Sequence, residues 1–161
     1  MPLGVKALAD TNFVVALLDA NDSLHQTASV LLQFLKAGST QIGYTDLVIN
    51  EVIVVVSRRF REQRRENQFE AMLTKIEQQY PAADLLWAYS GIEEKRPSLI
   101  EIVRKSGGKL NLHDALLGRT AELLQITYII SFDARLDSST FVKRISRSED
   151  IPPIDEDSPE C

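Results

Sequence analysis

The sequence contains a single cysteine, Cys161, which is the last of its 161 residues. One cysteine forms no disulfide within a chain and supplies no cysteine-rich zinc site. Long hydrophobic runs are also missing, because the longest, Phe13–Leu18, is far shorter than the roughly 20 residues that a membrane-spanning helix needs. The N-terminus shows no signal-peptide pattern. We therefore expect a protein of the cytoplasm that does not contact a membrane.

The glycine-rich motifs of nucleotide-binding proteins are absent as well. Neither G-x-G-x-x-G nor G-x-x-x-x-G-K-[ST] occurs in the chain, which disfavours a nucleotide-binding role. What the chain does have is an ordinary globular composition, with 44% hydrophobic and 25% charged residues. At this length, such a composition fits one domain with a sizeable core.

Charge is unevenly distributed along the chain. The net charge is −5, but residues 148–161 carry six acidic and no basic side chains, so the remainder is near +1. The same segment holds three prolines and little that packs in a core. We therefore expect a domain over residues 1–147, followed by a disordered acidic tail over residues 148–161.

Short apolar runs alternate with segments of helical spacing. Strands are expected over residues 5–9, 41–44, 84–89 and 128–131. Helices are expected over residues 13–18, 97–104 and 114–124, and between an N-cap in residues 21–23 and a C-terminal Gly38. Residues 45–67 are ambiguous because β-branched residues favour a strand, but their apolar positions follow helical spacing and favour a helix. This alternation predicts an α/β sandwich with a mainly parallel sheet.

Four carboxylates stand where a site can form. Asp10 and Asp133 follow two of the expected strands, and the carboxyl ends of parallel strands lie along one edge of a sheet. These two side chains are therefore expected to converge. Asp114 opens a helix, and Glu51 lies in the nearly apolar segment LVINEVIVVV, where an unpaired charge is costly.

Each of these acids also has a simpler explanation when taken alone. The three aspartates can be helix N-caps, and Glu51 can be a partly exposed helix residue with an arginine partner. A cluster is different, since two like charges about 4 Å apart cost about 4 kcal/mol at an effective dielectric of about 20. Protons or a cation must neutralise it. Oxygen ligands of this kind suit Mg²⁺ or Mn²⁺ held against a phosphodiester.

From about Leu8 to Ser139, the chain resembles PIN-domain proteins, most closely the toxin ribonucleases of the VapC type. The resemblance is carried by ADTNFVVALLDANDSLHQTA, the isolated Glu51, LNLHDALLGRTAELL and YIISFDARLD. It implies a three-layer α/β sandwich with a short, mainly parallel central sheet flanked by helices. The chain departs from the family pattern at Leu136, where an aromatic residue is common, in PAADLLWAYS and in the acidic tail.

The resemblance further implies a metal-dependent endoribonuclease. Its acidic quartet falls on Asp10, Glu51, Asp114 and Asp133, which would hold one or two Mg²⁺ or Mn²⁺ ions that activate a water molecule. The three aspartates are assigned mainly to metal coordination. Glu51 either binds metal or orients the water, and the sequence does not separate these roles.

Several neighbouring residues have two interpretations. Thr11 and Asn12 either orient Asp10 and contact a phosphate, or cap the following helix. His25 is expected to be structural. His113 either faces the substrate or simply begins a helix, and Asp137 is either a further acid of the site or a solvated turn residue.

A cluster of arginines follows Glu51 on the same expected helix. It can bind RNA phosphates, with Arg58 and Arg59 nearest the acids, or form a solvated helix face in which Glu62 pairs with its arginine neighbours. The cluster consists of Arg58, Arg59, Arg61, Arg64 and Arg65.

The resemblance implies two protein partners, a second copy of the chain and a small antitoxin that covers the site. A nuclease without an antitoxin remains open. A phosphatase with Asp10 as nucleophile is disfavoured, because Asn12 stands where that chemistry needs a second acid. The non-enzymatic alternative is a PIN-like module that binds RNA or protein without cleaving it.

Overall fold

The structure of the chain is a computed structural model that describes residues 6–153. Its strands are β1 (Lys6–Ala9), β2 (Gln41–Gly43), β3 (Tyr128–Ile130) and β4 (Lys143–Ile145). Its α-helices are α1 (Thr11–Leu18), α2 (His25–Ala37), α3 (Asp46–Glu62), α4 (Phe69–Gln79), α5 (Ile92–Lys105) and α6 (Leu112–Leu123). Short 3-10 turns are η1 (Glu66–Gln68), η2 (Ala82–Asp84), η3 (Ala134–Ser138) and η4 (Ser148–Asp150).

The four strands form one parallel sheet in the order β2-β1-β3-β4. Leu8 of the central strand β1 lies opposite Gly43 on one side and Ile129 on the other. Leu8 is completely buried, as expected of a parallel sheet covered on both faces. Gly43 permits this close packing, because a Cβ atom there would lie 2.9 Å from side-chain atoms of Leu8 and Leu86.

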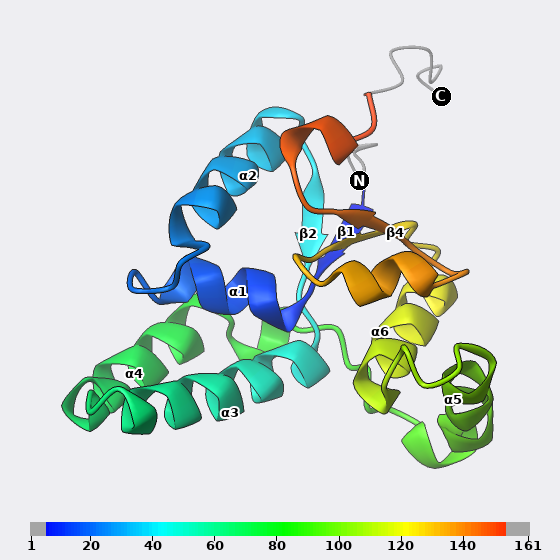
Figure 1. The fold of residues 1–161 in the computed structure, drawn as a ribbon, viewed down its shortest axis with the longest axis horizontal. Helices are drawn as coiled ribbons and strands as arrows, with labels where there is room; N and C mark the ends of the chain where they lie inside the picture. The colour runs from blue at the N-terminus through cyan, green and yellow to red at the C-terminus, as the bar shows by residue number, and fades with distance from the viewer. Residues whose placement is uncertain (1–5, 154–161) are drawn as a thin grey trace.

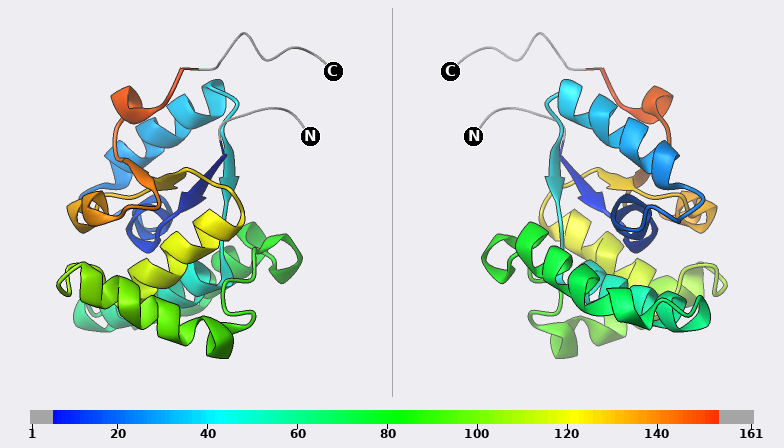
Figure 2. Two further views of the ribbon diagram at one scale, coloured as in Figure 1. Left: turned by 90° about the vertical axis from the view of Figure 1, so that its right-hand side faces the viewer. Right: turned by 90° about the vertical axis from the view of Figure 1, so that its left-hand side faces the viewer.

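Helices cover the two faces of the sheet. The connection from β1 to β2 contains α1 and α2, and the connection from β2 to β3 contains α3 to α6 (Figure 1). Strands β2 and β3 lie on either side of β1, so the chain leaves β1 toward one edge of the sheet and later returns to its other side. Helix α2 lies on the opposite face of the sheet from α5 and α6 (Figure 2). The predicted α/β class is confirmed.

Among residues 6–153, no helix is both long enough and apolar enough to span a membrane.

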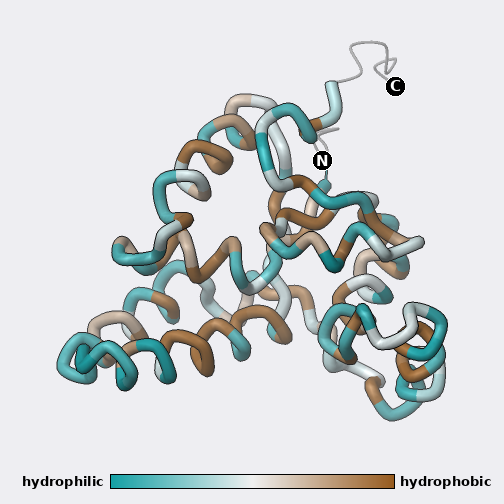
Figure 3. Tube along the Cα trace, viewed as in Figure 1, coloured by the Kyte–Doolittle hydropathy of each residue, from teal (hydrophilic) through white to brown (hydrophobic). Residues whose placement is uncertain are grey.

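The ambiguous segment after residue 45 is the helix α3. Thr45 caps it, since its hydroxyl accepts a hydrogen bond from the amide of Val48 at 3.2 Å. Ile49, Val52, Val56 and Phe60 are buried, and the step of three followed by steps of four is the spacing of one helix face. Figure 3 shows that the first half of α3 is mainly hydrophobic and that its C-terminal end, near α4, is hydrophilic. Periodicity therefore identified the element correctly against the β-branched composition.

The strand predicted over residues 84–89 is wrong. This segment begins within the turn η2 and then forms a single bridge, between Leu86 and Thr45. The buried Asp46 fixes it further, because its Oδ1 accepts a hydrogen bond from the amide of Ala88 at 2.6 Å. Apolar residues here pack against the start of α3 instead of joining the sheet, and a strand requires a paired neighbour along its length.

Other boundaries also differ from those expected. Helix α5 begins at Ile92, five residues before the expected start, and carries Pro97 inside its first two turns. Helices and strands expected elsewhere are found, but α4 and β4 had no counterpart in the prediction. Leu24 occupies the N-cap of α2, and Asp22 accepts a hydrogen bond from the Leu24 amide at 2.8 Å instead of capping the helix itself.

The segment expected to be a disordered tail begins with structure. Ser148–Asp150 forms η4, and Asp150 Oδ2 accepts hydrogen bonds from the amide and the hydroxyl of Ser146, each at 2.9 Å. Residues 154–161, including Cys161, lie outside the described residues, as do residues 1–5.

Candidate active site

The site lies at the carboxyl ends of the neighbouring strands β1 and β3, where the chain order in the sheet reverses. The amide of Asp10 donates a hydrogen bond to the carbonyl of Ile130 at 3.0 Å, which places residues 10 and 131 side by side. A cavity of about 260 Å³ opens at this edge. It is lined by all four acids and by the four residues considered for positioning or phosphate binding, namely Asp10, Glu51, Asp114, Asp133, Thr11, Asn12, Arg58 and Arg59. Ligand crevices of open α/β folds occur at such switch points.

Asp10 is held by three hydrogen bonds. Its Oδ1 accepts from the amide of Thr11 at 2.7 Å, and its Oδ2 accepts from Asn12 Nδ2 at 3.1 Å and from Ser131 Oγ at 2.7 Å. Asn12 also accepts a hydrogen bond from the amide of Phe132 at 2.9 Å, which ties α1 to the end of β3. Thr11 and Asn12 therefore orient Asp10. Ser131 was missed, although a hydroxyl directly after an apolar strand was a usable signal.

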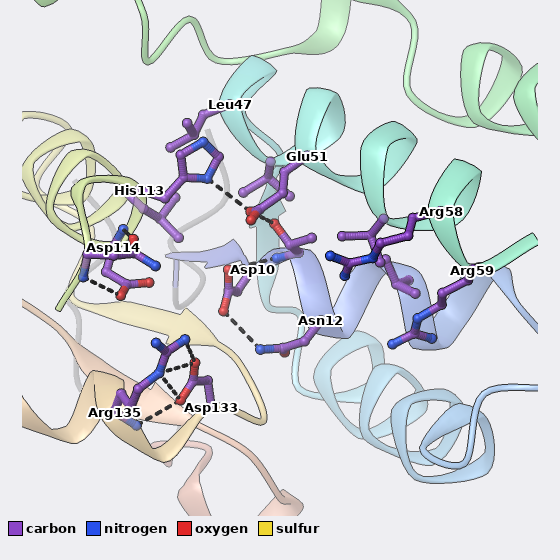
Figure 4. Close-up of a pocket in the computed structure, with 16 residues that line it drawn as sticks. Asp10, Asn12, Leu47, Glu51, Arg58, Arg59, His113, Asp114, Asp133 and Arg135 are labelled. Carbon is purple, nitrogen blue, oxygen red and sulfur yellow. Dashed lines mark hydrogen bonds and ion pairs between the residues drawn. The ribbon is translucent and has the colours of Figure 1, made fainter. Parts of the chain in front are cut away.

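Glu51 does not pair with an arginine, which was the partner considered for it from the sequence. It pairs with a threonine and a histidine. Its Oε2 accepts hydrogen bonds from Thr11 Oγ1 at 2.5 Å and from His113 Nδ1 at 3.0 Å (Figure 4). The hydrogen bond from His113 lowers the pKa of Glu51, and the same contact raises the pKa of His113. The pair therefore favours a carboxylate facing an imidazolium.

Asp114 lies in the first turn of α6 and forms a reciprocal cap with Asn111. The Asn111 side chain accepts from the amide of Asp114, and Asp114 Oδ2 accepts from the amide of Asn111, both at 2.9 Å. Burial raises the pKa of Asp114, with further contributions from the charges of Asp133 and Glu51. Burial also raises the pKa of Asp10, to which Asp114 and Glu51 add. These acids therefore repel one another across the cavity.

Asp133 differs because it is already paired with a cation. Arg135 Nε lies 3.1 Å from Oδ1 and 2.9 Å from Oδ2 of Asp133, and both residues line the cavity (Figure 4). The hydrogen bonds from Arg135 lower the pKa of Asp133 below its usual value. Arg135 was not among the residues singled out from the sequence. The arginine two positions after a site acid was the available signal.

The three aspartates both cap helices and line the site. Asp10 caps α1, Asp133 caps η3, and Asp114 belongs to the capping pair of α6. All three also line the same cavity. A carboxylate has about four acceptor positions, and a cap uses one of them for the backbone, so one residue serves both purposes.

The donor set fits a hard divalent cation in its chemistry, since every acid offers carboxylate oxygen and their mutual repulsion favours a positive charge between them. Within the part of the chain that the structure describes, no three acidic or histidine side chains are grouped closely enough to hold a metal ion. Asp133 is bound to Arg135. To bind a cation, Asp133 would have to exchange this partner.

The arginine cluster does not form the helix pairs with Glu62 considered for it. Arg59 pairs with Asp22, in the loop between α1 and α2. Arg58 is exposed and lines the cavity (Figure 4). Of the two arginines nearest the acids, Arg58 is therefore the one without an ion pair to an acid among the described residues.

Arg65 also fastens α3 to the end of α1. Its guanidinium donates to both carboxylate oxygens of Asp19, at 3.0 and 3.2 Å, and lies 4.1 Å from the centre of the Phe60 ring. Asp19 is 2% exposed. Arg65 therefore stabilises the fold and does not face the cavity.

Two further residues have roles outside the site. His25 Nδ1 contacts the carbonyl of Ala16 at 2.7 Å, in line with the structural role expected for it. Asp137 pairs with Arg144 at 2.8 Å and does not line the cavity, so the turn interpretation describes it.

Comparison with known proteins adds one match. A family model described as PIN domain matches residues 7–141, a range that contains all four acids and most of the described chain. A search of curated proteins gives no match.

Proposed function

The chain belongs to the PIN domain family, and on that premise we propose that it is a metal-dependent endoribonuclease. PIN domains are commonly metal-dependent nucleases. The observation that carries the proposal is the arrival of Asp10, Glu51, Asp114 and Asp133 at one cavity from four separate segments. Four acids at one edge of a sheet are costly unless a cation joins them.

Mg²⁺ or Mn²⁺, when bound, would lower the pKa of a water molecule and neutralise charge on the phosphodiester. Asp10 and Asp114 would hold it, since each has one oxygen fixed by a cap. Asp133 would join them after leaving Arg135. Arg135, which lines the same cavity, would then be able to donate two hydrogen bonds to a phosphate.

Arg58 would add a second phosphate contact, further along α3. Such contacts give affinity that depends on salt and not on base sequence. The resemblance to VapC toxins supports a finer proposal, namely that the chain is the toxin of a toxin–antitoxin pair. It would then act in the cytoplasm as a homodimer, and a small antitoxin would cover the cavity.

A second candidate is a PIN-like module that binds RNA or protein without cleaving it. The ion pair between Asp133 and Arg135 favours this candidate, because it already neutralises one acid of the four. The two candidates differ in their need for metal. A nuclease loses cleavage when the metal is chelated, whereas a binding module keeps its affinity for RNA and does not cut.

The test is cleavage of a structured RNA pool by protein purified free of any inhibitor, with Mn²⁺, Mg²⁺ or chelator. Asp114→Asn is nearly isosteric and removes one anionic ligand, so it should abolish cleavage while unfolding stays cooperative. Asp137→Asn is the matched control, since this acid lies outside the cavity. Undiminished cleavage by the Asp114 variant would refute the site. No cleavage by folded wild-type protein with any metal would favour the binding module.

A further inference from the structure

Three helices meet at one oxygen of Glu51. Thr11 is the first residue of α1, Glu51 lies in the second turn of α3, and His113 is the second residue of α6. Both hydrogen bonds to Glu51 end on Oε2, from Thr11 at 2.5 Å and from His113 at 3.0 Å. Neither contact occupies Oε1, which therefore remains available to a ligand.

We propose that His113 is a positioning residue, which together with Thr11 fixes the carboxylate of Glu51 so that Oε1 is the oxygen that acts on the bound metal or water. This inference rests on the proposed nuclease function. It also selects Nδ1 of His113 as the atom that matters, because Nδ1 is the atom in contact with Glu51.

Glu51 needs such support because its side chain is long and 37% exposed. A glutamate in this situation samples several rotamers, and holding one of them has an entropic cost. Two donors on one oxygen select a single orientation. Both donors are themselves fixed, since each belongs to the first turn of a helix.

The contact also connects Glu51 to the other acids. The amide of Thr11 donates to Asp10, and its hydroxyl donates to Glu51. His113, which donates to the same carboxylate, directly precedes Asp114 in α6. Hydrogen bonds therefore connect Asp10 to Glu51 through Thr11, and connect Glu51 to the residue that precedes Asp114.

A purely structural role explains the pair less well. His113 and Glu51 are each 37% exposed, and exposed pairs contribute little to stability. Both residues line the cavity, and their side chains point toward each other in Figure 4. The histidine is thus placed to act on the geometry of the site more than on the stability of the fold.

The choice of substitution tests this geometry. In asparagine, Nδ2 is two bonds from Cβ, as Nδ1 is in histidine, so His113→Asn keeps a donor near Glu51. In glutamine, the nitrogen lies one bond further out, and alanine has none. His25→Ala is a matched control, because it removes another Nδ1 contact between two residues that do not line the cavity.

Two quantities are measured for each variant: the Mn²⁺ affinity by calorimetry without RNA, and kcat and KM for RNA cleavage. We expect His113→Ala and His113→Gln to lose about 10- to 100-fold in kcat and to bind Mn²⁺ more weakly, as for other residues that orient a metal ligand. The KM for RNA should change little. His113→Asn should restore most of both quantities, and His25→Ala should lower the thermal midpoint without lowering kcat.

Equal impairment of the asparagine and glutamine variants would overturn the proposal, as would wild-type behaviour of the alanine variant in both measurements. If wild-type protein binds Mn²⁺ but does not cleave RNA, the nuclease proposal fails by itself. The Mn²⁺ affinities of the three His113 variants then still decide the positioning role. Wild-type protein that neither cleaves nor binds Mn²⁺ overturns both.

Discussion

Replacing Arg135 by methionine should strengthen metal binding while weakening catalysis. Arg135 holds both oxygens of Asp133, with Nε at 3.1 and 2.9 Å from them. Methionine keeps an unbranched side chain but removes the charge and the donors. A cation that enters the cavity must displace the guanidinium from Asp133, so its removal should ease binding.

The expected gain follows from the exposure of the pair. The side chain of Arg135 is 57% exposed and that of Asp133 is 24% exposed, so solvent screens their attraction. Such pairs contribute at most about 1 kcal/mol, and about 1.4 kcal/mol corresponds to a tenfold change in affinity. Arg135→Met should therefore bind Mn²⁺ up to about fivefold more tightly. Its kcat should fall, because one phosphate contact is lost.

Calorimetric titration with Mn²⁺ at neutral pH and low salt, without RNA, measures the effect. Arg119→Met is the matched control, since Arg119 pairs with Glu122 on α6 and does not line the cavity. The difference between the two variants should shrink as salt is added. Unchanged or weaker Mn²⁺ binding by Arg135→Met would show that Asp133 takes no part in holding the cation.

Two further predictions concern Asp19 and Arg58. Burial raises the pKa of Asp19, but hydrogen bonds from Arg65 and Asn21 outweigh it and leave the pKa below the ordinary 3.8. Its stabilisation is therefore present above about pH 4 and is lost as the pH falls through the lower folded-state value. Asp19→Asn should lower the free energy of unfolding by about 3 kcal/mol at pH 7 and by less at pH 3 in urea titrations; equal losses at both pH values would contradict this. Arg58→Gln should weaken RNA binding and reduce the slope of log affinity against log salt by about 0.7 to 1. Arg61→Gln, exposed on the same helix but outside the cavity, should change the slope less, and equal changes would remove Arg58 from the site.

Helix α3 shows what local pattern is able to predict. Its composition is rich in β-branched residues, but Ile49, Val52, Val56 and Phe60 form one apolar stripe on a helix, whereas on a strand Ile49 would lie on the opposite face from the other three. A stripe of this kind is read directly from the sequence. The element was therefore predictable before its neighbours were known.

The segment over residues 84–89 shows where local pattern fails. Its apolar residues resemble those of a strand, but only Leu86 finds a strand-like partner, and Asp46 takes the amide of Ala88. Whether a run of residues joins a sheet depends on which edge is free. That is decided by the packing of the whole chain.

The sequence by itself determined the α/β class, the buried strand that begins the sheet and the convergence expected of Asp10 and Asp133, because hydrophobic periodicity and strand ends are local properties. Glu51 and Asp114 were added to these two acids only by the resemblance to PIN domains. Only the tertiary structure decided their partners. Glu51 meets His113 across 62 positions of sequence, and Arg65 meets Asp19 across 46. Hydrogen bonds act over about 3 Å. Residue spacing along the chain does not specify distances on that scale between separate segments, so the partners are fixed only when the helices pack.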